Sequence, residues 1–197
     1  MSEAHRRYFE YLSRRSWLGH AYRRHWLYPR LCRYLHGRVL DIGCGIGDML
    51  RFLPGTIGVD VNPETVAACR SQGLDARVML PDTLPFPDSG FDSAVLDNVL
   101  EHLTDPGPLL AEIHRVLVPG GILLVGVPGP RGYHADPDHK IFYDPAGLRR
   151  TVEATGFHLR HLFRMPLNLE WLERHVNAAC VYGIFVRRVD STAGTRP

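Results

Sequence analysis

Short apolar runs alternate with segments of helical periodicity along most of the chain. The apolar runs have strand length and read RVLDIG (38–43), TIGVDV (56–61), ARVML (76–80), FDSAVLDN (91–98), GILLVGVP (121–128), FHLRHLFR (157–164) and CVYGIFVRR (180–188). Helices are predicted around 46–53 and over 63–73, 108–117 and 148–156. Strands that alternate with helices in this way predict an α/β domain with a mostly parallel sheet.

The first 36 residues stand apart from this pattern. Their aromatic residues and leucines recur near helical spacing, with arginines between them. One interpretation is a pair of amphipathic helices packed on the sheet. The other is a helical lid over a binding site, with arginines that attract carboxylates or phosphates. The sequence thus predicts a lid over 1–36, a main domain over 37–189 and a disordered tail over 190–197.

Composition indicates one globular domain. The 197 residues include 45% hydrophobic and 22% charged side chains, and no apolar run is long enough to span a bilayer. The start of the chain lacks the apolar core of a signal peptide. The four cysteines are scattered without a C-x-x-C pair, which favours reduced thiols in the cytoplasm over disulfides or a zinc site. Residues 1–38 are basic and the rest is acidic, so nucleic acid is not the expected partner.

The most informative motif is VLDIGCGIGDM (39–49), where an apolar strand runs into three glycines at alternate positions. Gly43, Gly45 and Gly47 allow a sharp turn and let a ligand approach the backbone. Dinucleotide-binding loops instead read G-x-G-x-x-G, whose third glycine lets a helix pack beneath a pyrophosphate. The spacing here therefore disfavours an NAD-dependent oxidoreductase. It suits a ligand with a charged amino-acid portion and no pyrophosphate, such as S-adenosylmethionine (SAM).

Four motifs follow one another as they do in class I SAM-dependent methyltransferases. They are VLDIGCGIGDM, IGVDVNPETV, LPFPDSGFDSAVLDNVLEHL and LLAEIHRVLVPGGILLVGVP. The chain resembles most the branch with the ubiquinone and menaquinone biosynthesis methyltransferases, a type 11-like methyltransferase domain, over residues 38–160. The resemblance implies a Rossmann-like sheet of seven strands, mostly parallel with an antiparallel last strand, and helices on both faces. It also implies SAM at the carboxyl ends of strands one to four, with S-adenosylhomocysteine as product.

The resemblance also assigns cofactor-binding positions. The residues expected to wrap the methionine portion of SAM are Asp41, Gly43, Cys44, Gly45 and Gly47. Asp60 ends the second strand and is expected to accept both ribose hydroxyls; its alternative role is to cap the helix that begins at Pro63. Val61 and Asn62 are expected to flank the adenine and the ribose.

The adenine contact and the methyl-donor region rest on other positions. The family places an aspartate where this chain has Leu80, so either a shifted loop brings Asp82 to the adenine or the backbone alone reads the base. Asp97, Asn98 and Val99 end the fourth strand, where the family lines the methyl-donor region. The alternative for Asp97 is a buried structural carboxylate.

Candidate acid–base groups gather in RGYHADPDHKIFYDPAGL (131–148), at the edge where an acceptor must enter. A hydroxyl acceptor needs a base within hydrogen-bond reach, and His139 is the first candidate, followed by His134 and Tyr143. The alternative is that His139 only orders the loop. A metal site in HADPDH (134–139) is not expected, because a proline separates the groups and they cannot easily converge.

An additional helix is predicted over 165–179, near the same pocket, with Trp171 as a wall residue. Together these features predict a SAM-dependent methyltransferase for a small-molecule, glycan or lipid-linked acceptor, with oxygen favoured over nitrogen or carbon. The alternative is a SAM-binding protein without turnover that acts as a partner or regulator. Peripheral contact with a membrane surface is compatible with the basic first segment. We expect a monomer or homodimer in the cytoplasm.

Overall fold

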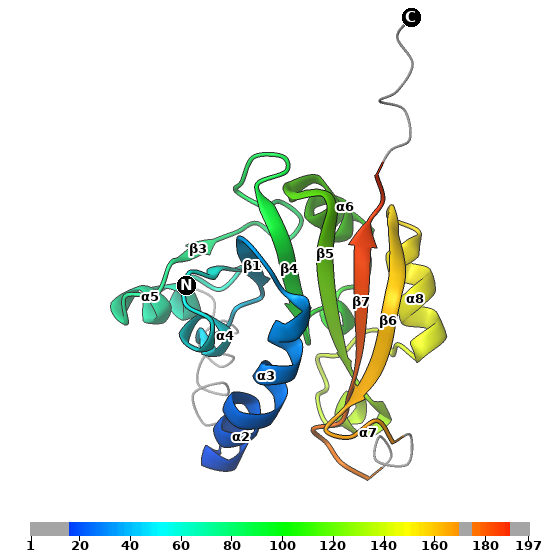
Figure 1. Ribbon diagram of the computed structural model, residues 1–197. Coiled ribbons are helices and arrows are strands. Elements are labelled where there is room, and N and C mark those ends of the chain that lie inside the picture. The colour runs from blue at the N-terminus through cyan, green and yellow to red at the C-terminus, as the bar shows by residue number, and fades with distance from the viewer. Residues whose placement is uncertain (1–15, 170–174, 190–197) are drawn as a thin grey trace, which may run out of the picture.

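The computed structural model describes residues 16–169 and 175–189. Seven strands in these ranges form one sheet, in the order β3-β2-β1-β4-β5-β7-β6 (Figure 1). Their bounds are β1 Val39–Ile42, β2 Ile57–Asp60, β3 Ala76–Val78, β4 Phe91–Asp97, β5 Leu117–Pro128, β6 Phe157–Met165 and β7 Cys180–Arg187. The first five strands pair in parallel, and β7 is antiparallel to both β5 and β6. The predicted α/β class and the seven-stranded sheet with an antiparallel last strand are confirmed.

Helices connect the strands and lie on both faces of the sheet (Figure 1). Their bounds are α2 Trp17–Tyr22, η1 Arg23–Leu27, α3 Tyr28–Leu31, η2 Cys32–Tyr34, α4 Asp48–Phe52, α5 Pro63–Ser71, η3 Leu100–His102, α6 Gly107–Val116, α7 Pro130–His134 and α8 Pro145–Glu153. The η1 segment is a π-helical turn, and η2 and η3 are 3-10 turns. The predicted arrangement of helices around the sheet is therefore present in the described ranges.

The core lies in apolar layers on the two sides of β5. Successive side chains of a strand point to opposite faces. Accordingly Leu123, Val125 and Val127 pack in the layer that holds α6 and α8, whereas Ile122 and Leu124 pack in the layer that holds η1, α3 and α4. A strand buried on both faces needs an unbroken apolar sequence, which β5 has over 121–128.

The N-terminal helical run, α2 to η2, packs on the sheet over part of its length. Leu27, Tyr28 and Leu31 are 3%, 4% and 0% exposed, and they share an apolar layer with residues of β4, β5 and β7. Packing of helices on the sheet, one of the two interpretations of this segment, thus describes 27–31. The start of the predicted lid, 1–15, and the predicted tail, 190–197, lie outside the described residues.

Strand β5 is longer than predicted. It begins at Leu117, which pairs with Phe91, and not at Gly121. The Pro-Gly-Gly sequence at 119–121 reads as a turn, but a register shift between Phe91 and Ser93 lets the strand pass through it. The helix before it still ends near its predicted position.

Two loops also differ from the prediction. A short helix, α7, forms at Pro130–His134, where the sequence indicated only a loop. The helix predicted over 165–179 is absent from both of its described parts, 166–169 and 175–179, so that prediction is wrong there. Trp171 lies outside the described residues. Within the described ranges, no helix is both long and apolar enough to cross a membrane.

Candidate functional site

The glycine loop leaves the end of β1 in a conformation that favours glycine. Gly43, Gly45 and Gly47 have φ values of +73°, +52° and +82°, in the left-handed region. A Cβ atom on Gly43 would lie 2.5 Å from Cγ2 of Val99. The backbone N–H groups of Gly43 and Cys44 both donate to the carbonyl of Val59, at 2.8 and 3.0 Å, which fastens the loop to β2.

Asp60 joins this loop to the end of β2. Its Oδ2 accepts a hydrogen bond from Gly45 N, and its Oδ1 accepts one from Asn62 N, both at 2.8 Å. Asn62, not Asp60, caps α5, because its side chain accepts from Glu64 N at 3.0 Å. The alternative role of Asp60 as the helix cap is therefore wrong. A carboxylate has about four acceptor positions, so two backbone donors do not exhaust it.

The carboxyl end of β4 carries a polar network that includes the N-terminal helical run. Arg23 Nη1 lies 3.4 Å from Asp97 Oδ2 and donates to the Tyr28 hydroxyl at 3.2 Å. The hydroxyl of Tyr182, from β7, donates to Asp97 Oδ1 at 2.9 Å. Burial raises the pKa of Tyr182, which keeps this hydroxyl a donor. Arg23, Tyr28 and Tyr182 were not singled out from the sequence, because the chain brings them to Asp97 from distant elements.

Asp41 is buried beside this network. Burial is the main cause that raises the pKa of its carboxyl to about 8, and the nearby carboxylates of Asp97 and Asp60 act in the same direction. A buried carboxyl with a raised pKa is a site where a cation would be favourable. A cationic group of a ligand would therefore be favourable beside Asp41, where the glycine loop begins.

Two cavities meet at Gly43 and Asn98, which line both of them. The polar cavity, of about 80 Å³, is also lined by Arg23, Tyr28, Asp41, Cys44, Gly45, Ile46, Asp48, Met49, Val95 and Asp97. The apolar cavity, of about 240 Å³, is also lined by Ile42, Asp60, Val61, Met79, Pro81, Val99, His102, Leu103 and Leu109. Asn98 has a φ of +56°, an uncommon conformation that occurs at functional sites. A charged compartment next to an apolar one fits a ligand with an amino-acid end and a nucleoside end.

Most predicted cofactor residues line these cavities, but three do not. Gly47 is the N-terminal cap of α4 and lies in the loop behind the polar cavity. Asn62 is buried as the cap of α5. Asp82 is exposed and does not line the apolar cavity, although its neighbour Pro81 does.

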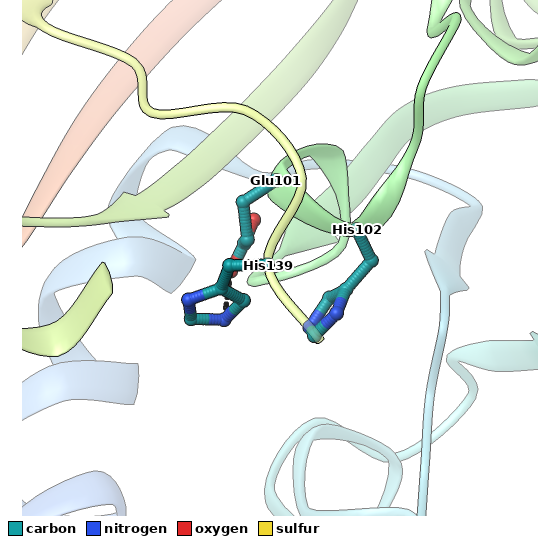
Figure 2. A group of neighbouring side chains, drawn as sticks. All are labelled: Glu101, His102 and His139. Carbon is teal, nitrogen blue, oxygen red and sulfur yellow. Dashed lines mark ion pairs between the residues drawn. The ribbon is translucent and has the colours of Figure 1, made fainter. Parts of the chain in front are cut away.

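A second group of polar side chains lies just past Asn98 (Figure 2). It consists of Glu101 and His102, in η3, and His139, in the loop after α7. His139 Nε2 lies 3.8 Å from Glu101 Oε1, and the centroids of the two imidazole rings are 4.7 Å apart. His139 Nδ1 lies 2.8 Å from the carbonyl oxygen of Tyr133, so it is the protonated nitrogen and Nε2 faces Glu101. Glu101 lies within the motif LPFPDSGFDSAVLDNVLEHL, but nothing in the sequence alone indicates a role for it.

Glu101 is the most deeply buried member of this group. The residue is 0% exposed, and neither carboxyl oxygen has a hydrogen-bond partner among the described residues. Burial raises the pKa of its carboxyl to about 8, and the carboxylates of Asp97 and Asp136 add to this effect. Burial also lowers the pKa of His102, with a further contribution from His139. Such perturbed groups beside a cavity indicate a functional site.

The other two candidate bases lie differently. His134 is exposed at the end of α7, where its ring contacts Tyr133 at a centroid distance of 5.4 Å. Tyr143 is 5% exposed and packs in the apolar core, and its hydroxyl has no hydrogen-bond partner within the described ranges. Burial, with a smaller effect of Glu101, raises the pKa of Tyr143 to about 12. Of the three, His139 is the one that belongs to a buried polar group next to the apolar cavity.

Comparison with known proteins shows which sequences and folds this chain is similar to. Residues 40–125 match the family model described as a methyltransferase domain. A probable S-adenosylmethionine-dependent methyltransferase of Mycolicibacterium smegmatis is 35% identical over 153 residues, which cover 69% of this chain and 58% of that protein. The demethylmenaquinone methyltransferase of Thermus thermophilus is 36% identical over 109 residues, 48% of this chain and 50% of that protein. The chain thus spans about half the length of these curated relatives.

Other relatives have different named acceptors. A human protein described as probable tRNA methyltransferase 9B is 34% identical over 110 residues, 51% of this chain and 24% of that protein. Among solved structures, a SAM-dependent methyltransferase of Thermotoga maritima, described as a possible histamine N-methyltransferase, superimposes with a TM-score of 0.73. The two sequences are 20% identical, and the superposition covers 93% of this chain and 98% of the Thermotoga maritima chain. This structure therefore supports the fold.

Proposed function

We propose that the chain, whose residues 40–125 match a methyltransferase-domain family model, transfers the methyl group of SAM to an acceptor that enters beside Glu101 and His139. One observation carries the proposal. The polar and apolar cavities meet at Gly43 and Asn98, at the carboxyl edge of the parallel strands, where open α/β sheets bind ligands. Their different linings match the two halves of SAM.

The residues of each cavity suit a particular part of the cofactor. The guanidinium of Arg23 suits the SAM carboxylate, and the carboxyls of Asp41 and Asp97 suit its ammonium group. Asp60 suits the ribose hydroxyls, in line with its predicted role. Val61 and Val99 offer apolar walls for the adenine. The adenine contact predicted for Asp82 would need its loop to move, because this side chain is exposed.

For methyl transfer, the protein mainly has to position the two reactants and exclude water from the site. Bound SAM supplies an electrophilic methyl carbon for in-line displacement, so correct placement of the acceptor gives much of the rate. A hydroxyl acceptor must also lose its proton. His139 is suited to accept it at Nε2, because the carbonyl of Tyr133 holds the ring with the proton on Nδ1.

The chemical class of the acceptor is inferred from the candidate base and from the named relatives. We propose a small-molecule, glycan or lipid-linked acceptor that reacts at oxygen, because a base candidate lies next to the cavity. One relative is named as a quinone-type methyltransferase and another as a tRNA methyltransferase. Nucleic acid therefore stays among the acceptors to be tested, against the expectation from charge. The second candidate function is a SAM-binding partner protein without turnover.

Calorimetric titration tests the cofactor site. SAM and S-adenosylhomocysteine should bind, and NAD should not. Asp60→Ala should lose about 2 kcal/mol of SAM binding, or roughly thirtyfold in Kd. Asp75→Ala is the matched control, because this aspartate is exposed and lies away from both cavities. Equal SAM affinity in wild type and Asp60→Ala, with both folded by circular dichroism, would contradict the site.

Transfer from labelled SAM tests the reaction. Small-molecule extract, lipid extract and tRNA are offered separately, and the labelled product identifies the acceptor class. Label in the small-molecule or lipid fraction, at oxygen, is the expected result. Label in tRNA would replace the proposed acceptor with a nucleic acid. Tight SAM binding without label in any fraction would favour the non-catalytic alternative.

A further inference from the structure

The group formed by Glu101, His102 and His139 has the chemistry of a metal site. One potential ligand atom from each of the three side chains lies within 4.8 Å of the others. Figure 2 shows the carboxyl of Glu101 beside the His139 ring, with His102 reaching toward the same region. Two imidazoles and one carboxylate can occupy one face of a metal ion and leave other positions open.

Glu101 gives the first independent reason to expect an ion. Its side chain is 1% exposed, and both carboxyl oxygens lack a hydrogen-bond partner among the described residues. A buried polar group without a hydrogen bond costs about 1–3 kcal/mol and is uncommon in native proteins. A cation bound at this position would be a partner for the Glu101 oxygen that lies nearest the histidines.

The orientation of His139 gives the second reason. Metal-bound histidines usually donate their other ring N–H to a carbonyl or carboxylate, which fixes the ring and the tautomer. His139 Nδ1 makes such a contact with the carbonyl of Tyr133, at 2.8 Å. The second nitrogen of His139 then points at Glu101.

We propose that Glu101, His102 and His139 bind one divalent transition-metal ion, of the Zn²⁺, Co²⁺ or Mn²⁺ type, at the acceptor edge of the site. Two nitrogen ligands disfavour Mg²⁺ and Ca²⁺, which take oxygen ligands. Bonds of about 2.0–2.1 Å place ligand atoms roughly 3.0–3.4 Å apart, so ligand atoms separated by as much as 4.8 Å must close by up to about 1.4–1.8 Å. Asp136 is a candidate fourth ligand, because its Oδ2 lies 4.0 Å from His139 Nε2.

The metal would change how the acceptor loses its proton, and this part rests on the proposed function. A His139 nitrogen bound to metal cannot also accept a proton. An acceptor hydroxyl that coordinates the open position would lose its proton to solvent, because a divalent cation lowers the pKa of a bound hydroxyl. The resulting oxygen anion then attacks the methyl carbon, and the thioether S-adenosylhomocysteine leaves.

Metal titration of the chelator-treated full chain tests the site. We expect one equivalent of Zn²⁺ or Co²⁺ by calorimetry, visible absorption bands for the Co²⁺ form, and weaker binding of Mg²⁺. Glu101→Gln and His139→Ala should each weaken Zn²⁺ binding at least about tenfold. His134→Ala is the matched control, because this histidine is exposed on the neighbouring helix. It should leave binding unchanged.

Measurements on the same protein samples distinguish failure of the metal site from failure of the proposed function. SAM binding is measured beside metal binding in every variant. Absence of stoichiometric Zn²⁺ and Co²⁺ binding, with SAM binding intact, would overturn the metal site alone. Metal binding that survives both Glu101→Gln and His139→Ala would also overturn it, and would assign the ion to other groups such as the cysteines. Metal binding without SAM binding would support the site and contradict the proposed function.

Discussion

Replacement of Gly43 by alanine tests whether the glycine loop is shaped by its contact with Val99. Gly43 has a φ of +73°, and an added Cβ would lie 2.5 Å from Val99 Cγ2, closer than real Cβ atoms approach a neighbour. Gly73 provides a matched control. Its φ is +75°, but a Cβ there meets nothing within 4 Å. The two substitutions therefore share the backbone strain and differ in the clash.

The expected magnitudes follow from this difference. A left-handed conformation costs an alanine about 1–2 kcal/mol, and the stiffer unfolded chain returns about 0.4–1 kcal/mol, so Gly73→Ala should cost roughly 0–1.6 kcal/mol. Overpacking adds about 1–3 kcal/mol, so Gly43→Ala should cost more than Gly73→Ala by that amount. Val99 lines the apolar cavity, so its displacement should also weaken SAM binding.

Urea unfolding and calorimetric SAM titration measure the two effects. Val99→Ala in the Gly43→Ala background should restore most of the extra loss of unfolding free energy, because it removes the methyl group that clashes. The reasoning would be refuted if Gly43→Ala and Gly73→Ala were equally stable and bound SAM equally well. It would also be refuted if Val99→Ala gave no recovery.

Three further predictions follow from the site. The pKa of Asp41 is raised to about 8, so ionisation of this buried carboxyl opposes folding. The free energy of unfolding should therefore fall as pH rises from about 4 to about 8. Urea titrations should show a smaller fall in Asp41→Asn. Arg23→Ala should weaken SAM binding by about 1.5–3 kcal/mol, because Arg23 lines the polar cavity. Arg24→Ala, at an exposed neighbouring position, should leave SAM binding unchanged. Equal SAM Kd values for Arg23→Ala and Arg24→Ala would contradict the assignment of Arg23. His139→Ala should lower turnover roughly a hundredfold while the SAM Kd stays within a few-fold, because the residue either accepts the proton of the acceptor or holds the proposed metal ion. His134→Ala should have the weaker effect. Wild-type kinetics in His139→Ala would contradict both roles and leave this residue an ordering role.

The strands could be predicted because their signals are local. Each apolar run has strand length, and the glycine motif places a turn at its own position in the chain. Strand β5 shows the limit of this reasoning. Its first residue, Leu117, pairs with Phe91 only because the neighbouring strand shifts register at that point. A pairing partner that decides where a strand begins cannot be inferred from the strand's own sequence.

The candidate site likewise contains residues that local motifs predict and residues that only the folded chain brings together. Gly43, Gly45 and Asp60 belong to contiguous motifs, so they could be named from the sequence. Arg23 and Tyr182 reach Asp97 across 74 and 85 residues of chain, so only the folded sheet brings them together. Glu101 lay inside a recognised motif, but its importance depends on burial and on the approach of His139, which no local pattern reports.

The two interpretations of the N-terminal segment are compatible in the folded chain. Leu31 is fully buried, and Trp26 Nε1 donates to the carbonyl of Pro166 at 2.7 Å, so this part is fixed to the sheet. Arg23 lies one turn earlier and lines the polar cavity. Removal of residues 1–36 would therefore strip apolar core as well as any lid. If the start of this run moved away from the sheet, Arg23 would separate from Asp97, which lies 3.4 Å from it in the structure.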